Sequence, residues 1–320
     1  GAIGDCDCCA SNVIEVVEIT ELLEFFNELF LNFQTKENGH TLISIIQGNW
    51  SLFSDISHGN KILNYVLNIL NTQFKNAEEV VGFSDEILEN VNHWFTLKEQ
   101  LKWERRYFIN IDYLTEDLGW DGFFESKTKI KNEDLFYRAR LHKNANQKQY
   151  ENEEMLCPPK EISSAGRANP IGIPYLYLCD NEETILYEIR ASYLDEASVA
   201  TFSLNKEVSQ DILISDFTEV PALYVPGEVN KRIKSTLLKQ IISRDLSKPM
   251  RRYDSELDYI PTQFICEFIK IFTDVKGIKF RSSIHNVGNN IVIFDQDLMS
   301  CKSIKKVRIS NVNIKSIDIK

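Results

Sequence analysis

Four polar side chains in the second half of the sequence could together cleave a bond next to a bound diphosphate. In chain order they are two arginines, a tyrosine and a glutamate: Arg138, Arg167, Tyr177 and Glu188. Arginine holds phosphate oxygens with paired donors, an aromatic ring stacks on a heterocycle, and a carboxylate stabilises a sugar carbon that becomes electron-deficient. The set therefore suits a ligand that contains a diphosphate, an aromatic ring and a ribose.

The segment around Arg167 has the composition of a loop that contacts a ligand. It reads SAGRANPIG over residues 164–172, and its glycines let the backbone approach a ligand closely. Tyr175 and Tyr177 follow two residues apart, so in a strand they point to one face, where a nicotinamide ring could stack. Taken singly, each residue would be an ordinary surface cation, turn residue or packed aromatic, and only their joint order indicates a site.

Seven short motifs in a fixed order give this half of the sequence a resemblance to the RES domain, a family of NAD+-degrading enzymes. They are RAR (138–140), GRANPIG (166–172), YLYL (175–178), EIR (188–190), YIPTQ (259–263), GIKFRSS (277–283) and NNIVIF (289–294). The resemblance covers about residues 135–296. It implies an α+β fold similar to that of ADP-ribosyltransferases, and an enzyme that breaks the bond between nicotinamide and ribose in NAD+.

The resemblance also implies a role for each candidate residue. Arg138 and Arg167 would clamp the diphosphate, and Glu188 would stabilise the developing cation. The remaining candidates are Tyr177, packed on nicotinamide or its ribose, Asn169, a substrate-binding residue, and Ser282, which orients the ribose or the acceptor. Ser283 competes with Ser282 for the family's serine, because the preceding pair is Phe-Arg rather than the usual Phe-Pro or Tyr-Pro.

The acceptor of the ADP-ribosyl group stays open at this stage. Phosphate would make the protein an NAD+ phosphorylase, water would make it a glycohydrolase, and a side chain would make it a protein ADP-ribosyltransferase. The resemblance implies a bacterial toxin or defence effector with a neutralising partner such as an antitoxin. NAD+ would be a substrate rather than a resident cofactor, inorganic phosphate a co-substrate, and no metal would be needed. The alternative is a non-catalytic sensor of NAD+ or ADP-ribose.

Composition limits the partners and the location that we expect. The 320 residues suffice for one large or two ordinary domains. Lys and Arg number 36 against 47 Asp and Glu, a formal net charge of −11, which disfavours nucleic acid as the main ligand. No run approaches the roughly 18 apolar residues of a membrane span. The sequence therefore predicts a cytoplasmic protein that binds neither nucleic acid nor membrane.

The first part of the chain, residues 1–125, is predicted to be a helical bundle. Apolar residues recur with a helical period, most clearly at Leu22, Phe25, Phe26, Leu29, Phe30 and Phe33. This region resembles, loosely, the HEPN-like region that precedes RES domains in some proteins, which suggests a regulatory or partner-binding role. Three cysteines near its start, Cys6, Cys8 and Cys9, form at most half of a zinc site, so structural or unliganded thiols are favoured.

The second part, residues 126–320, is predicted to be the RES domain, and mixed α and β. Short apolar or alternating runs near residues 135–141, 175–178, 200–204, 211–216 and 290–294 predict strands. Two helices are predicted between them, one from a capping box at 180–183 to about Ser192 and one over Thr262 to Phe272. The fold class expected for the whole chain is α+β.

Overall fold

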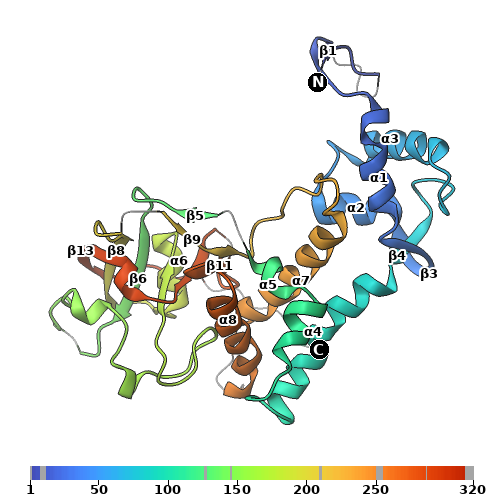
Figure 1. The fold of residues 1–320 in the computed structure, drawn as a ribbon. Helices are drawn as coiled ribbons and strands as arrows, with labels where there is room; N and C mark the ends of the chain where they lie inside the picture. Colours follow the sequence, from blue (N-terminus) through green and yellow to red (C-terminus); the bar gives the residue numbers. More distant parts are fainter. Residues whose placement is uncertain are drawn as a thin grey trace. The chain divides into compact units, whose positions relative to one another are not determined.

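The computed structural model describes residues 2–7, 12–125, 128–144, 146–208, 211–249, 255–285 and 287–313. The described elements comprise helices and a large mixed sheet, so the α+β class is confirmed (Figure 1). The chain divides into two compact units. Unit 1 contains Gly1–Lys98 and Glu219–Lys239, and unit 2 contains Glu99–Thr218 and Gln240–Lys320. Each unit therefore combines two separate stretches of the chain.

Unit 1 combines helices with two antiparallel strand pairs. Its helices are η1 (Ile19–Leu22), α1 (Leu23–Phe30), α2 (Leu42–Trp50), α3 (Ile56–Ile69) and the first parts of α4 (Asp85–Trp103) and α7 (Val229–Ser247). Its strands are β1 (Ala2–Gly4), β2 (Ile14–Val16), β3 (Phe33–Thr41) and β4 (Val80–Phe83), paired antiparallel as β1–β2 and β3–β4.

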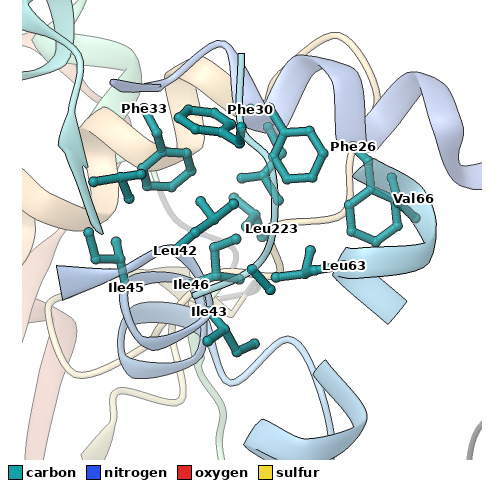
Figure 2. Packing of buried hydrophobic residues seen from close by; sticks show 14 of the residues in the cluster. Phe26, Phe30, Phe33, Leu42, Ile43, Ile45, Ile46, Leu63, Val66 and Leu223 are labelled. Atoms are coloured by element: carbon teal, nitrogen blue, oxygen red, sulfur yellow. The ribbon is translucent and has the colours of Figure 1, made fainter. Parts of the chain in front are cut away.

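The apolar series predicted for the first helix forms the core of unit 1. Phe25, Phe26, Leu29 and Phe30 on α1 are buried against α2 and α3, together with Leu223 from the second stretch (Figure 2). Phe33 belongs to the same core, but it begins β3 instead of extending the helix. The helical prediction was wrong there, because one phenylalanine at the end of a 3.6-residue series fits a helix and a half-buried strand equally well.

Unit 2 is built on a sheet with the strand order β10-β11-β12-β7-β6-β8-β13 among the described residues. These strands are β6 (Phe136–Leu141), β7 (Leu176–Cys179), β8 (Glu196–Leu204), β10 (Ser215–Asp216), β11 (Gly277–Arg281), β12 (Asn289–Ile293) and β13 (Met299–Arg308). All neighbours run antiparallel except β10 and β11. A separate pair joins β5 (Lys129–Ile130) to β9 (Ile212–Leu213).

The last part of α7 belongs to unit 2, and the other helices of this unit are short except for α8. They are the π-helical turn η2 (Tyr113–Asp117), α5 (Trp120–Phe124), η3 (Glu153–Met155), η4 (Lys160–Ile162), α6 (Glu182–Glu188), η5 (Glu256–Tyr259), α8 (Ile260–Phe272) and η6 (Gln296–Leu298). The predicted strands and α8 are confirmed. The prediction for α6 ran too far, and α7 was not predicted, because its apolar residues do not form a regular stripe.

The sheet of unit 2 is apolar on both faces and is interrupted in its middle. One face carries a core that includes Phe136, Leu176 and Ile291, and the other carries Ala139 and Cys179 beneath α6. β6 pairs with β8 through six residues but with β7 only through Tyr137 and Cys179. The backbone groups of β6 and β7 beyond that point are therefore available for side chains and ligands.

Candidate functional site

Glu188 is the last residue of α6. Asn181 caps the start of this helix, where its side chain accepts a hydrogen bond from the backbone N–H of Thr184 at 3.0 Å. Arg190, two residues after Glu188, adopts a positive φ of 54°, which ends the helix. A carboxylate at a helix C-terminus faces the negative end of the helix dipole, so it needs donors from elsewhere in the fold.

Two side chains from other elements supply those donors to a single oxygen of Glu188. Ser282 Oγ and Asn290 Nδ2 each donate to Glu188 Oε1 at 2.8 Å. No side chain or backbone group of the described residues donates a hydrogen bond to Oε2. One oxygen is therefore used to orient the carboxylate, and the other is left for a ligand.

The structure distinguishes the two serines that competed in the sequence. Ser282 follows β11 and is 5% exposed, and its Oγ also accepts the backbone N–H of His285 at 3.1 Å. Ser283 is exposed, and no hydrogen bond from its side chain to a described residue is formed. Ser282 is thus the serine that contacts Glu188.

Tyr177 on β7 is fixed by the loop that contains Arg167. Its hydroxyl donates to Asn169 Oδ1 at 2.8 Å and accepts the backbone N–H of Ala168 at 3.0 Å. Burial raises the pKa of this phenol, which therefore stays neutral. Gly166 packs so closely on the hydroxyl that a Cβ there would lie 2.6 Å from it. Glycine at this position therefore lets the loop pack against Tyr177, so its small size serves a contact within the protein.

Asn169 and Tyr175 have mainly structural contacts. Asn169 is 4% exposed, and its Nδ2 donates to the backbone oxygens of Ser164 and Pro170 at 3.2 and 3.1 Å. The ring of Tyr175 packs against Phe294, with the ring centroids 5.1 Å apart. Tyr175 is therefore part of the core, and Tyr177 is the one of the two tyrosines whose hydroxyl holds the loop.

Arg138 and Arg140 extend from the same face of β6, and neither has a negative partner among the described residues. Arg138 Nη1 donates to the backbone oxygen of Tyr177 at 2.9 Å, and Arg140 Nη2 donates to that of Leu156 at 2.7 Å. The Nε atoms of both arginines are buried without a hydrogen-bond partner in the described structure. Burial and the neighbouring charge of Arg140 lower the pKa of Arg138 to about 10. Neither guanidinium forms an ion pair with a carboxylate of the described ranges.

Arg167 lies in the loop before β7, whereas Arg138 and Arg140 lie on β6. Its Nη1 donates to the backbone oxygen of Leu246 at 2.9 Å, and its own backbone oxygen accepts the Thr262 hydroxyl at 2.6 Å. Its positive charge lowers the pKa of the Tyr177 phenol slightly against the effect of burial. Within the described residues, no hydrogen bond joins Arg167 to Arg138 or Glu188.

The structure thus joins most of the candidates in two separate hydrogen-bonded groups, and the side chains of Arg167 and Ser283 belong to neither. Arg138 contacts Tyr177, Tyr177 contacts Asn169, and Glu188 contacts Ser282. Asn290 was missed as a site residue, although its motif NNIVIF was noticed. The signal in the sequence was a pair of amides at the start of an otherwise apolar strand.

His285 also lies beside the group of Glu188 and Ser282. Its Nδ1 is 2.8 Å from the hydroxyl of Thr184, and its ring stacks on Tyr187 with the centroids 4.7 Å apart.

Among the described residues no group of three or more metal-ligating side chains is present. Of the three N-terminal cysteines, Cys6 is half-buried and unbonded to another sulfur, whereas Cys8 and Cys9 lie outside the described residues. None of the described helices has the length and apolar character needed to cross a lipid bilayer.

Comparison with known proteins identifies one family. No curated protein and no solved structure matches the chain. The RES domain model matches residues 135–312, a range that contains every candidate side chain described above and more than half of the chain. The chain therefore belongs to the RES domain family.

Proposed function

We propose that this protein cleaves the bond between nicotinamide and ribose in NAD+. The observation that carries the proposal is the pair Arg138 and Arg140, two partly buried cations that no carboxylate of the described residues neutralises. Burying a cation without a partner is costly, so such a pair favours an anionic ligand. RES domains are associated with NAD+-related toxins, so the anionic ligand that we propose is the diphosphate of NAD+.

Glu188 is the group proposed to act on the sugar. Cleavage breaks the bond between C1′ and the nicotinamide nitrogen, and the bonding electrons leave with nicotinamide, which becomes neutral. The positive charge moves to the ribose as an oxocarbenium ion. The unbonded Oε2 of Glu188 would stabilise this charge, while Ser282 and Asn290 hold Oε1. Little acid catalysis is required, because the leaving group carries no negative charge.

The strand β7 links the proposed binding and reacting groups. The backbone oxygen of Tyr177 accepts the Arg138 guanidinium, and Cys179, two residues further along, is hydrogen-bonded to the asparagine that holds Glu188. Residues two apart in a strand are separated by about 7 Å. The contact of Arg138 and the contact that leads to Glu188 therefore lie at neighbouring positions of one strand.

Inorganic phosphate and water are the two acceptors that we propose to distinguish by their products. An oxygen of phosphate would then form the new bond to C1′ and give an ADP-ribose phosphate. Water as acceptor would give ADP-ribose. If the protein acts as a toxin in the cytoplasm, its production in bacteria should lower cellular NAD+ and arrest growth, and a partner protein should neutralise it.

The test follows nicotinamide release by proton NMR, with and without inorganic phosphate. Release with a phosphorylated sugar supports phosphorolysis, and phosphate-independent release of ADP-ribose supports hydrolysis. Glu188→Gln should lower turnover at least about 100-fold, the cost of removing a group that stabilises transition-state charge. Glu183→Gln, on the exposed side of the same helix, is the matched control and should leave turnover unchanged.

Unchanged turnover in Glu188→Gln would reject the role proposed for Glu188. The absence of nicotinamide under every condition would reject the proposed cleavage, and two further measurements then separate the alternatives. Label transferred from NAD+ to protein would indicate a protein ADP-ribosyltransferase, and calorimetric binding of NAD+ without its consumption would indicate a sensor.

A further inference from the structure

Asn290 lies between a buried thiol and the carboxylate of Glu188. Its Oδ1 accepts a hydrogen bond from Cys179 Sγ at 3.0 Å, and its Nδ2 donates to Glu188 Oε1 at 2.8 Å. Asn290 is 8% exposed and Cys179 is 1% exposed, so water does not compete for these groups. The two bonds leave only one orientation of the amide that satisfies both neighbours.

The thiol is well suited to fix that orientation. Burial, together with the negative charges of Glu188 and Asp180, raises the pKa of Cys179, so the sulfur keeps its proton and remains a donor. A protonated thiol cannot accept well from the amide nitrogen, so the amide oxygen must face the sulfur. The NH2 group is then directed at Glu188.

The strand that carries Asn290 is held at its first residue. The carboxylate of Asp180, which follows β7, accepts both the backbone N–H and the side-chain Nδ2 of Asn289 at 2.7 Å. Gly288 lies against Thr184 of α6, where a Cβ would lie 2.3 Å from the threonine hydroxyl. The segment 288–290 therefore fixes the start of β12 against β7 and α6.

We infer that Asn290 is a positioning residue for Glu188 and that Cys179 sets the orientation of its amide. The pair acts as a relay from thiol to amide to carboxylate, which holds Oε1 and aims Oε2 at the substrate. This role in turnover rests on the proposed function. The relay itself is a property of the folded protein and can be measured without turnover.

The kinetic test uses Asn290→Ala, Cys179→Ala and Cys179→Ser. Asn290→Ala should lower kcat for nicotinamide release about 10-fold to 100-fold, the range known for outer partners that orient a reacting group, with KM for NAD+ changed less than about twofold. Cys179→Ala should lower kcat in the same way, and Cys179→Ser, which keeps a donor, should restore it. Cys301→Ala, on the edge strand β13, is the matched control.

Asn290→Asp gives a signature that a merely structural role would not produce. It places a second carboxylate at hydrogen-bond distance from Glu188, and a proton shared by the two restores the missing donor at low pH. The ratio of mutant to wild-type kcat should therefore rise as the pH falls from 8 towards 5. The other titratable groups near Glu188 include Cys179, Asp180, Tyr137 on β6, His285 and the sequence neighbours Tyr187 and Arg190, and all of them are identical in the two proteins.

Side-chain amide NMR of the asparagine-labelled protein separates failure of the relay from failure of the proposed function. The Asn290 NH2 signals, assigned with Asn290→Ala, should shift in Glu188→Ala and in Cys179→Ala but not in Cys179→Ser. This result would support the relay even in a protein that releases no nicotinamide. Unchanged signals in both alanine variants, or equal losses of kcat in Cys179→Ala and Cys179→Ser, would overturn it.

Discussion

Gly166→Ala is the sharpest structural test of how the arginine-bearing loop holds Tyr177. An alanine Cβ at this position would lie 2.6 Å from the Tyr177 hydroxyl and 2.6 Å from Asn169 Oδ1. A Cβ atom essentially never lies within 3.0 Å of a non-bonded heavy atom in a folded protein, so something must move. The hydroxyl cannot move away without weakening its bonds to Asn169 and to the backbone N–H of Ala168.

The magnitude follows from two contributions. Overpacking of a filled interior costs about 1–3 kcal/mol. Weakening one of the two hydrogen bonds adds about 0.5–1.5 kcal/mol. We therefore expect Gly166→Ala to lower the free energy of unfolding by about 2–4 kcal/mol, or the midpoint by roughly 5–15 °C for a domain of this size.

The assay is a double-mutant cycle by urea and thermal unfolding, followed by circular dichroism. Tyr177→Phe removes the hydroxyl that the new methyl group strikes, so Gly166→Ala should cost at least about 1 kcal/mol less in the Phe background than in the wild type. Gly48→Ala in α2 is the control, because nothing lies within 4 Å of its Cβ position and alanine favours the helix by about 1 kcal/mol. Additive costs of the two mutations, or a stable Gly166→Ala variant, would refute the reasoning.

Three further predictions address the site and the pH dependence of stability. Ser282→Ala should lower nicotinamide release at least about tenfold, since it removes a donor to Glu188, while Ser283→Ala should match the wild type in the same NMR assay. Arg140→Gln should weaken NAD+ binding by about 10-fold or more in calorimetry, and wild-type affinity would argue against an anion at this arginine. Hydrogen bonds from a lysine and an arginine of β13 lower the pKa of Glu196 from 4.5 to about 2. The stability from this contact should be complete above about pH 4.5 and should be lost as the pH falls to about 2, so Glu196→Gln should flatten the thermal stability curve over that interval.

Much of the sheet of unit 2, its helix α8 and the family could be predicted from the amino-acid sequence. The strands β6, β7 and β12 and the helix α8 follow from apolar alternation and helical periodicity, which are local properties of a few consecutive residues. The candidate residues were found because their types occur in a fixed order along the chain. Local pattern was insufficient where two structures fit it equally, as at Phe33, which begins a strand instead of ending a helix.

Which of those side chains contact one another depends on the three-dimensional fold. Ser282 and Asn290 contact Glu188 across 94 and 102 residues of sequence, and the contact depends on β12 lying beside β7 in the sheet. A one-residue change of register would exchange Ser282 with Ser283, or Asn290 with Asn289, and the sequence pattern is the same for both members of each pair. The hydrogen bonds of Glu188 are therefore properties of strand order and register, which arise from long-range packing and not from local spacing.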